Sequence, residues 1–157
     1  QDALTHVANW IESLLGPTQS LLCDCAHLAI PNVDVEDTVH ISARHAHAVC
    51  SYSLNQFQAP NETYIQLNAA RGSIRIELHR QRWGTFTATS ADWEWRTLPP
   101  VERDHHFTVQ AGAFLDQVEG RRGPLCSLES AIQTLRFNLA ALASAQSGTR
   151  VACAHVS

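Results

Sequence analysis

An aspartate and a histidine stand four residues apart at the start of the chain, as Asp2 and His6. On a helix this spacing puts both side chains on one face, about one turn apart. An imidazole, with an ordinary pKa of about 6.5, can accept a hydroxyl proton at neutral pH, and a neighbouring carboxylate fixes its tautomer and favours its protonated form. Such a pair suits the oxidation of an alcohol, although the spacing is also common in surface pairs and capped helix starts.

The pair lies at the beginning of a predicted helix over residues 2–15. Its apolar residues recur at spacings of three and four, as one stripe: Leu4, Val7, Ile11, Leu14 and Leu15. Gly16 and Pro17 then predict its end.

From Ser20 onward the apolar pattern changes to period two, which is typical of half-buried antiparallel strands. The alternation is found in residues 38–42, 49–54, 64–67 and 73–78, and two aromatic-rich segments follow at 83–89 and 93–98. Turn residues between these segments indicate hairpins. The middle of the chain therefore predicts six or seven strands.

Two helices are predicted after Pro99-Pro100. The first ends at Gly120 and has an apolar face made of Phe107, Ala111, Phe114, Leu115 and Val118. The second begins at Ser127 as N-cap, runs to Gly148, and has an apolar face made of Ala131, Leu135, Leu139, Leu142 and Ala143. Helices at both ends and strands between them predict an α+β fold, a single largely antiparallel sheet with helices packed on one face, in one domain over residues 1–157.

Composition and charge exclude two classes of partner. All basic residues are arginines, and the formal net charge of −4 offers no basic field for a nucleic-acid backbone. No apolar run reaches the roughly 20 residues that a membrane-spanning helix needs. We therefore expect neither a nucleic acid nor a membrane as a partner.

The cysteines and the start of the chain bear on its cellular context. Five cysteines without CxxC spacing argue against a full disulfide framework and a zinc ribbon, so we expect buried, reduced thiols and a cytoplasmic location. The chain begins with Gln1, contains no methionine and opens directly into a helical pattern. We therefore expect it to be a fragment of a longer protein, which leaves the question of an export signal open.

Two separated parts of the sequence resemble one family. The first helix resembles the segment DxxxHxxDxxxxLxG at the start of the second domain in the glucose-fructose oxidoreductase and inositol dehydrogenase (Gfo/Idh/MocA) family. Residues 107–120, 123–131 and 140–148 resemble the two closing helices of that domain and the loop between them. The matches span nearly the whole chain, and the central strands agree in pattern more than in sequence.

The resemblance implies a division of labour between two domains. In this family a first, Rossmann domain binds NAD or NADP and usually contributes a lysine, while the second domain supplies substrate contacts. Matched by position, His6 is the catalytic acid/base, Asp2 its catalytic partner, and Asn9 a substrate-binding residue, although the family often has aspartate there. The chain has no lysine and no GxGxxG after a strand, so no cofactor is expected in this fragment, which fits a truncation or a degenerate homologue.

Two hypotheses of function follow. The first is the C-terminal domain of an NAD(P)-dependent oxidoreductase acting on a sugar, cyclitol or related polyol, inactive without its own N-terminal Rossmann domain. The second is a non-catalytic dimerisation or ligand-binding module of the same fold. A face with Trp83, Trp93 and Trp95 could form a homo-oligomer through the sheet or could finish the edge of the core. The sequence does not encode the substrate, the choice of cofactor, the direction of reaction or a hydrolytic variant.

Other clusters are better explained by structure. The pairs His45 with His47 and His105 with His106 could ligate a metal only if the fold added an Asp or Cys, and no metal is expected because nine histidines make chance pairs common. Cys23 and Cys25 have no CxxC spacing for a redox role. The polar loop 55–62 could contact a ligand or simply be solvated.

Overall fold

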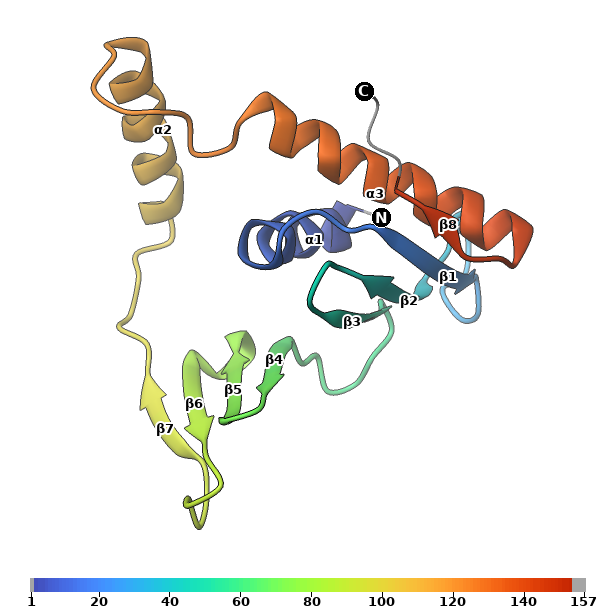
Figure 1. Ribbon diagram of the computed structural model, residues 1–157, viewed down its shortest axis with the longest axis horizontal. Coiled ribbons are helices and arrows are strands. Elements are labelled where there is room, and N and C mark those ends of the chain that lie inside the picture. The colour runs from blue at the N-terminus through green and yellow to red at the C-terminus, as the bar shows by residue number, and fades with distance from the viewer. Residues whose placement is uncertain (1, 154–157) are drawn as a thin grey trace. The chain divides into compact units, whose positions relative to one another are not determined.

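The computed structural model describes the backbone of residues 2–153 and the side chains of residues 4–153 (Figure 1). Three helices are present in this part of the chain: α1 (Asp2–Leu15), α2 (His105–Val118) and α3 (Leu128–Ser147). The strands are β1 (Ser20–Ala26), β2 (Thr38–Arg44), β3 (Val49–Asn55), β4 (Tyr64–Ala69), β5 (Gly72–Glu77), β6 (Arg82–Phe86), β7 (Glu94–Thr97) and β8 (Val151–Ala152), with a 3-10 turn at Leu78–Arg80. The chain divides into two compact units, residues 1–57 with 122–157 and residues 58–121, and each is described by itself.

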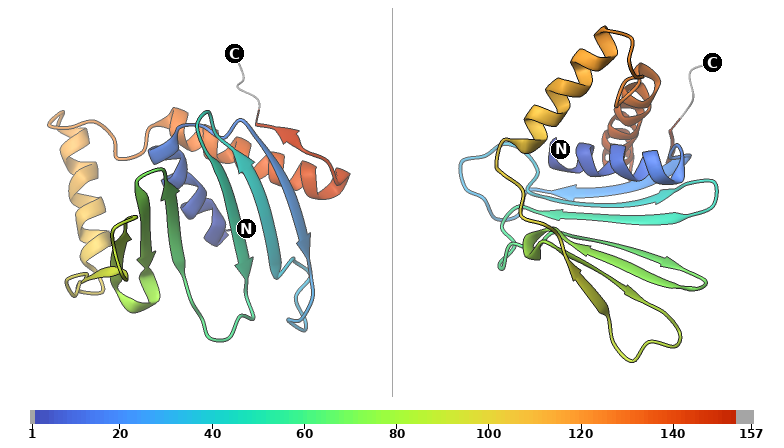
Figure 2. Two further views of the ribbon diagram at one scale, coloured as in Figure 1. Left: turned by 60° about the horizontal axis from the view of Figure 1, so that its bottom comes forward. Right: turned by 90° about the vertical axis from the view of Figure 1, so that its left-hand side faces the viewer.

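The first unit is a four-stranded antiparallel sheet in the order β3-β2-β1-β8, which we call the first sheet. Helices α1 and α3 lie on the same face of it (Figure 2). In the register, Leu21 pairs with Ala43, Cys23 with Ile41, and Ile41 with Tyr52. These residues are all buried, because alternate positions along each strand point toward the helices.

Phe137 of α3 is the centre of this core. It is 1% exposed, and its ring meets the ring of Tyr52 edge-on with the centroids 5.4 Å apart. Leu21 on the sheet and Ala8 on α1 are both fully buried as well. The core of the first unit therefore joins both helices to the middle strands, which fixes α1 in place.

The loop between β1 and β2 is organised around a buried carboxylate. Asp37 accepts hydrogen bonds from the backbone N–H groups of Leu28, Ala29 and Ile30 at 2.8–2.9 Å, and from the Thr38 hydroxyl at 3.1 Å. Burial alone would raise the pKa of this carboxyl, but the donors outweigh that cost and hold the pKa well below its usual range.

The second unit contains an antiparallel sheet in the order β4-β5-β6-β7, which we call the second sheet. Strand alternation places its aliphatic residues on one face, together with Trp83: Ile65, Leu67, Ile74 and Ile76. The other face carries aromatic and charged residues. There the buried Glu77 carboxylate accepts a hydrogen bond from Arg82 at 2.6 Å and lies 3.0 Å from Nε of Arg75.

A glycine shapes the charged face of the second sheet. A Cβ atom on Gly84 would lie 2.9 Å from Cε3 of Trp95, so only glycine lets this indole lie against β6. The Arg82 guanidinium covers the same indole, 3.9 Å from its ring centroid. Trp93 extends the cluster by stacking on Trp95 at 5.5 Å.

Most of the predicted architecture is confirmed. The fold is α+β with antiparallel strands, Ser127 caps α3 by accepting a hydrogen bond from the Ser130 N–H, and Gly148 ends α3 with a positive φ. The single sheet is not confirmed, since the strands form two sheets of four. Strand β8 was not predicted, because two residues are too short to show an alternating pattern.

The sequence predicts Trp83, Trp93 and Trp95 on one face of the sheet, and this prediction is wrong. Gly84 pairs with Trp95 and Trp83 pairs with Arg96, so Trp83 and Trp95 point to opposite faces of the second sheet. Arg96 accordingly packs on the Trp83 ring, 4.8 Å from its centroid.

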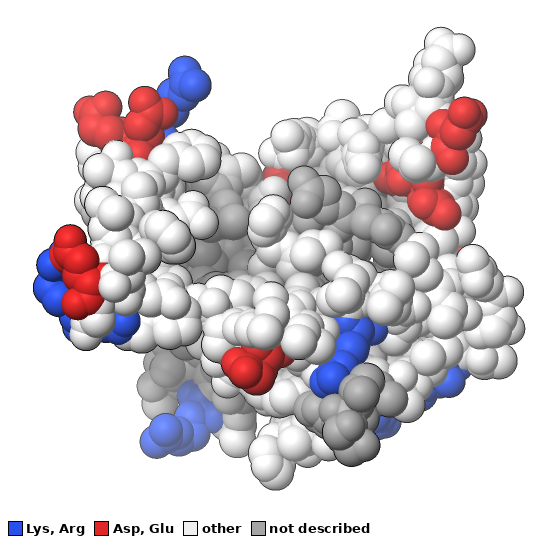
Figure 3. All heavy atoms as spheres, turned by 90° about the horizontal axis from the view of Figure 1, so that it is seen from above, with Lys and Arg blue, Asp and Glu red and all other residues white. Residues whose placement is uncertain are grey.

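The apolar face predicted for α3 is not the face that packs on the first sheet. The buried residues of α3 are Gln133, Thr134, Phe137, Ala140 and Ser144. Leu135 and Leu139 of the predicted face are 55% and 57% exposed. Figure 3 shows the chain from above the view of Figure 1, and most of the side chains on the surface seen there are uncharged. The apolar face predicted for α2 is also exposed, at Phe107, Phe114, Leu115 and Val118.

Candidate functional site

Helix α1 places His6, one of the two candidate catalytic residues, on its outward side. Leu4, Ala8 and Ile11 are buried, whereas His6 is exposed, as expected for a residue half a turn away from that stripe. Asp2 is the first residue of α1, and its position, four residues before His6, is on the same face of the helix. The Asp2 side chain lies outside the described side chains, so its pairing with His6 stays a prediction.

Hydrogen bonds hold α1 against α3 at three successive levels. Asn138 Nδ2 donates to Thr5 Oγ1 at 3.0 Å at the level nearest the start of α1. In the middle, Asn9 Nδ2 donates to Thr134 Oγ1 at 2.9 Å, and Ser130 Oγ lies 3.3 Å from the same nitrogen. The amide nitrogen of Asn9 therefore points at α3, and the predicted substrate contact of Asn9 stays a prediction.

Glu12 forms the third level and was missed by the sequence analysis. Its buried carboxylate accepts hydrogen bonds from the Thr18 backbone N–H at 3.1 Å, Gln133 Nε2 at 3.2 Å and Thr134 Oγ1 at 3.3 Å. The only signal in the sequence is its position four residues after Ala8, on the packed side of the helix. Glu12 thus fixes how α1, and with it His6, is oriented.

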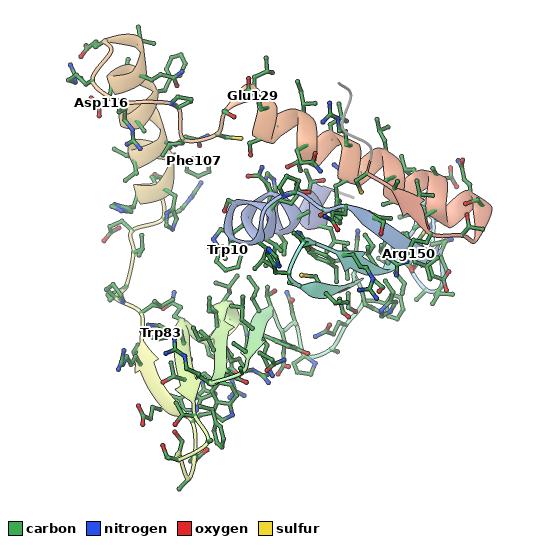
Figure 4. All side chains as sticks on the ribbon, in the orientation of Figure 1. Trp10, Trp83, Phe107, Asp116, Glu129 and Arg150 are labelled. Atoms are coloured by element: carbon green, nitrogen blue, oxygen red, sulfur yellow. The ribbon has the colours of Figure 1, made fainter. Side chains whose placement is uncertain are left out.

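Next to Glu12 the surface between α1 and α3 is hollowed. The hollow is lined by Glu12, Pro17, Glu129, Ser130, Ile132, Gln133 and Arg136. Figure 4 shows Glu129 at the first turn of α3 and Trp10 on α1. The hollow lies between α1 and α3, and His6 lies on α1.

The cysteines are free thiols, and two of the five are buried. Burial raises the pKa of Cys23 and of Cys153 to about 11, with the neighbouring Cys25 and Glu12 respectively adding to the effect. Cys25 and Cys50 are half-buried, and Cys126 is exposed. At neutral pH the Cys23 and Cys153 thiols are protonated and therefore poor nucleophiles.

The histidine pairs are not joined by further ligands in the described part of the chain. His45 is buried with Nδ1 2.8 Å from the carbonyl oxygen of Gly16, while His47 is exposed. The rings of His105 and His106 lie 5.7 Å apart at the start of α2. Residues 4–153 contain no group of three or more His, Cys, Asp or Glu side chains that could hold a metal ion.

The side chains of the loop after β3 make local hydrogen bonds. Asn55 Oδ1 accepts from the Phe57 N–H at 3.0 Å, and Gln58 Nε2 donates to the Pro60 carbonyl oxygen at 3.2 Å. The ligand contact considered for this loop stays a prediction.

A dinucleotide does not fit the residues of this chain. Dinucleotide sites are built at the glycine-rich turn between a parallel strand and its helix. Every strand pair within residues 2–153 is antiparallel. The expectation that this chain alone binds no nicotinamide cofactor stays a prediction.

The sequence matches no protein-family model and no protein of curated function. Solved structures do match the fold. The WlbA dehydrogenase from Bordetella pertussis, in complex with NADH and UDP-GlcNAcA, matches 96% of this chain at 19% identity and a TM-score of 0.74. A levoglucosan dehydrogenase in complex with NADH and L-sorbose matches 97% at 18% identity and a TM-score of 0.82. An oxidoreductase domain protein from Kribbella flavida matches 98% at 17% identity and a TM-score of 0.81.

These matches show that the chain has the fold of one half of such oxidoreductases. It covers 46% of the WlbA dehydrogenase and 49% of each of the other two chains, so it spans about half the length of the solved structures that it matches. Within residues 2–153, no helix combines the length and the apolar character that crossing a membrane requires.

Proposed function

We propose that the chain is the C-terminal domain of an NAD(P)-dependent oxidoreductase of the Gfo/Idh/MocA family, and that His6 transfers the proton of the substrate hydroxyl. The observation that carries this proposal is the position of His6 on the outward side of α1, in a domain with the fold of half a dehydrogenase. A catalytic imidazole must be accessible to substrate and must be held by a rigid element. Helix α1 meets both conditions, because Asn9 and Glu12 fix it to α3.

In this proposal, two residues of this chain take part in the proton transfer. The His6 imidazole accepts the hydroxyl proton when an alcohol is oxidised and returns it in the reverse direction. NAD or NADP, held by the other half of the longer protein, would supply the acceptor for the hydride that leaves the same carbon. Asp2, one turn earlier on α1, orients the imidazole and stabilises its protonated form. General acid–base catalysis of this kind contributes about 10²- to 10⁴-fold to the rate.

The substrate class in this proposal is a sugar, cyclitol or related polyol. Its support is the set of molecules found with proteins of the same fold: UDP-GlcNAcA, levoglucosan and L-sorbose. All three contain hydroxyl groups on a carbon chain or ring, which is the group that an imidazole base would deprotonate.

In the proposal, this chain is active only together with the other half of the longer protein. The solved structures are about twice as long as this chain and were determined with NADH in several cases. In the proposal an N-terminal Rossmann domain binds NAD or NADP, and closure of the two domains on the substrate brings the reacting groups together. The isolated chain is then inactive.

Calorimetry with NADH and NADPH tests the division of labour. The full-length product of the gene should bind one of the two cofactors, and this chain alone should bind neither. Binding by this chain alone would contradict the assignment of the domains. Failure of the full-length product to bind either cofactor would contradict the proposed function.

A His6→Ala variant tests the role of the imidazole. In the full-length protein, kcat should fall by about 10²-fold or more with cofactor affinity unchanged. The matched control is His40→Ala, because His40 is an exposed histidine on β2, on the face of the first sheet opposite the helices. Equal activity of the His6→Ala and His40→Ala variants would contradict a catalytic role of His6.

A second candidate function is an assembly module. The aliphatic face of the second sheet favours it, since Ile74 is exposed there and Ile65, Leu67, Ile76 and Trp83 are only half-buried. In this proposal a second copy packs on that face to form a homo-oligomer. Sedimentation of the full-length protein and of an Ile74→Lys variant tests it, because the variant should dissociate if the face is the interface.

The proposal also includes a cytoplasmic location. Its support is that the five cysteines are free, as in reducing compartments.

A further inference from the structure

Two thiols share one face of β1 and line a cavity inside the first unit. Cys23 and Cys25 are alternate residues of the strand, so both side chains point to the face that α1 and α3 cover (Figure 2). Every residue that lines the cavity belongs to the first unit, so the cavity is a feature of that unit alone. Its volume is about 30 Å³, and most of its wall is apolar: Leu4, Val39, Ile41, Phe137, Ala141 and Leu142.

The cavity has room for one small guest but offers a water molecule few partners. A volume of this size is enough for an atom as large as a water oxygen, and a buried water typically makes about three hydrogen bonds. Thiols form only weak hydrogen bonds. The other polar side chains of the wall are Asn138, whose amide donates to Thr5 Oγ1 at 3.0 Å, and the exposed Glu36. The cavity therefore suits a guest that prefers sulfur to oxygen.

A disulfide between Cys23 and Cys25 does not fit the strand. Alternate residues of a strand lie about 6.6 Å apart with their Cβ atoms pointing the same way, whereas a disulfide needs Cβ atoms about 3.5–4.5 Å apart. The ladder to β2 holds the strand extended across both residues. Ser144 Oγ also accepts a hydrogen bond from the Cys23 N–H at 2.9 Å. The strand therefore cannot contract to join the two sulfur atoms.

The surroundings of the thiols favour a cation over bare thiolates. Burial raises the pKa of both thiols, and the nearby carboxylates of Asp24 and Glu36 add to the rise. The thiols also share a side-chain hydrogen bond, so the two sulfur atoms face each other. A cation placed between them would be attracted by the same negative charges that oppose deprotonation in its absence.

We infer that Cys23 and Cys25 form a two-coordinate site for a soft monovalent cation, and that this cation is Cu⁺. Thiolate sulfur selects Cu⁺, zinc or iron–sulfur clusters. Structural zinc sites and iron–sulfur clusters take about four protein ligands, and residues 4–153 hold no group of three or more His, Cys, Asp or Glu side chains that could bind a metal ion. Cu⁺ is satisfied by two thiolates on opposite sides, which keeps the sulfur atoms apart as the strand requires.

Binding exchanges two protons for the ion and involves no oxidation or reduction. Both S–H bonds break, two Cu–S bonds form, and both protons go to solvent, so two thiols and Cu⁺ give a Cu(I) dithiolate of charge −1 and two protons. The affinity should therefore rise about 100-fold for each pH unit near neutrality, because two protons are released for each ion bound. This site is independent of the proposed function.

Anaerobic titration with Cu⁺, supplied as its acetonitrile complex and in competition with the chelator bicinchoninate, tests the site in the full-length product of the gene. Affinity should fall at least about 100-fold in Cys25→Ser, because a single thiolate cannot hold the ion in this way. Cys126→Ser is the matched control, since Cys126 is an exposed thiol outside the cavity. Equal affinities of the two variants would overturn the inference, as would the failure of the unmodified protein to take Cu⁺ from the chelator.

A second variant tests the cavity without changing either thiol. Ala141 of α3 lines the cavity, so Ala141→Leu should fill it and weaken Cu⁺ binding at least about tenfold. Ala143→Leu adds the same side chain at an exposed position of α3 and should leave the affinity unchanged. Unchanged affinity in Ala141→Leu would mean that the ion is bound outside the cavity, and the inference would be wrong.

X-ray absorption at the copper edge identifies the ligands directly. The unmodified protein loaded with one Cu⁺ should show two sulfur neighbours and no nitrogen neighbour. Three sulfur neighbours, or any nitrogen neighbour, would place the ion at other cysteines or at a histidine and would overturn the inference. An affinity that did not change with pH would also overturn it, because the two thiols would then not be the groups that lose protons.

Discussion

The side-chain amide of Asn9 donates a hydrogen bond to the hydroxyl of Thr134 across 2.9 Å, which links α1 to α3. Thr134 in turn donates to the buried carboxylate of Glu12 at 3.3 Å, so the contact is part of a chain that returns to α1. The amide donor thus has a structural role, whether or not Asn9 also meets a substrate. The family that the sequence resembles often has an aspartate at the matching position, and an ionised aspartate could not donate this hydrogen bond.

An Asn9→Asp variant should therefore destabilise the protein. The change removes the donor to Thr134 and adds a second carboxylate to the network around Glu12, at a cost of about 1–3 kcal/mol. Urea denaturation should show this as a lower midpoint. Gln110→Glu is the control, since it makes the same amide-to-carboxylate change at an exposed position of α2 and should change stability by less than about 0.5 kcal/mol. Equal stability of the two variants would contradict the structural role of the amide.

Phe137 should be the most sensitive large residue of the first unit. Replacing it with alanine removes the edge-on contact with Tyr52 and leaves a cavity between α3 and the first sheet, at a cost of about 3–5 kcal/mol. Thermal unfolding followed by circular dichroism measures the loss. Phe114→Ala makes the same change at an exposed position of α2 and should have little effect on the isolated chain. A small loss at both positions would mean that the core of the first unit lies elsewhere.

Local signals in the sequence were enough to predict most of the elements, although not β8. Gly16 and Gly148 predicted the ends of the helices that precede them, and in the first sheet alternation predicted the strands because one side of each strand faces the core. The side of α1 on which His6 lies was not predicted, and the structure places His6 opposite the buried Leu4 and Ile11.

The packed face of α3 could not be predicted in the same way. Hydrophobic periodicity favours Leu135 and Leu139 as the buried side, but Ser144 and Gln133 are buried instead. Their polar groups are acceptable in the core because Cys23, Thr149 and Glu12 supply hydrogen-bonding partners that only the tertiary structure brings together. Hydrophobic periodicity shows that a helix has an apolar side, but it does not show whether that side is the one that packs on the sheet.

Gly84 should tolerate no larger residue. A Gly84→Ala substitution places a Cβ 2.9 Å from Trp95, which must move and thereby weaken its stacking with Arg82, at a cost of about 1–3 kcal/mol. Near-ultraviolet circular dichroism and urea denaturation should both report the change. Gly112→Ala is the control, because no atom lies within 4 Å of its added Cβ and α2 should gain about 0.5–1 kcal/mol. Stabilisation by both substitutions would contradict the packing of Trp95 on β6.

The carboxylate of Asp37 should give the protein a distinct acid sensitivity. Because its pKa is lowered in the folded state, its contribution to stability is complete above the unfolded pKa of about 3.9 and is lost as the pH falls toward the folded value. Asp37→Asn keeps the size of the side chain but turns an N–H donor toward the backbone donors of Ala29 and Ile30. The variant should unfold at a clearly lower temperature at pH 7.

The difference in Tm between the Asp37→Asn variant and the unmodified chain should narrow as the pH falls below about 4, because the unfolded chain then takes up a proton on Asp37 that the folded chain does not yet bind. Scanning calorimetry between pH 7 and pH 2.5 measures this directly. Asp24→Asn removes the same charge from an exposed position on β1 and controls for net charge, with an expected change in Tm that is small at pH 7. A Tm difference for Asp37→Asn that stayed constant across the pH range would contradict the prediction. The ionised Asp37 carboxylate would then not be what stabilises the loop between β1 and β2.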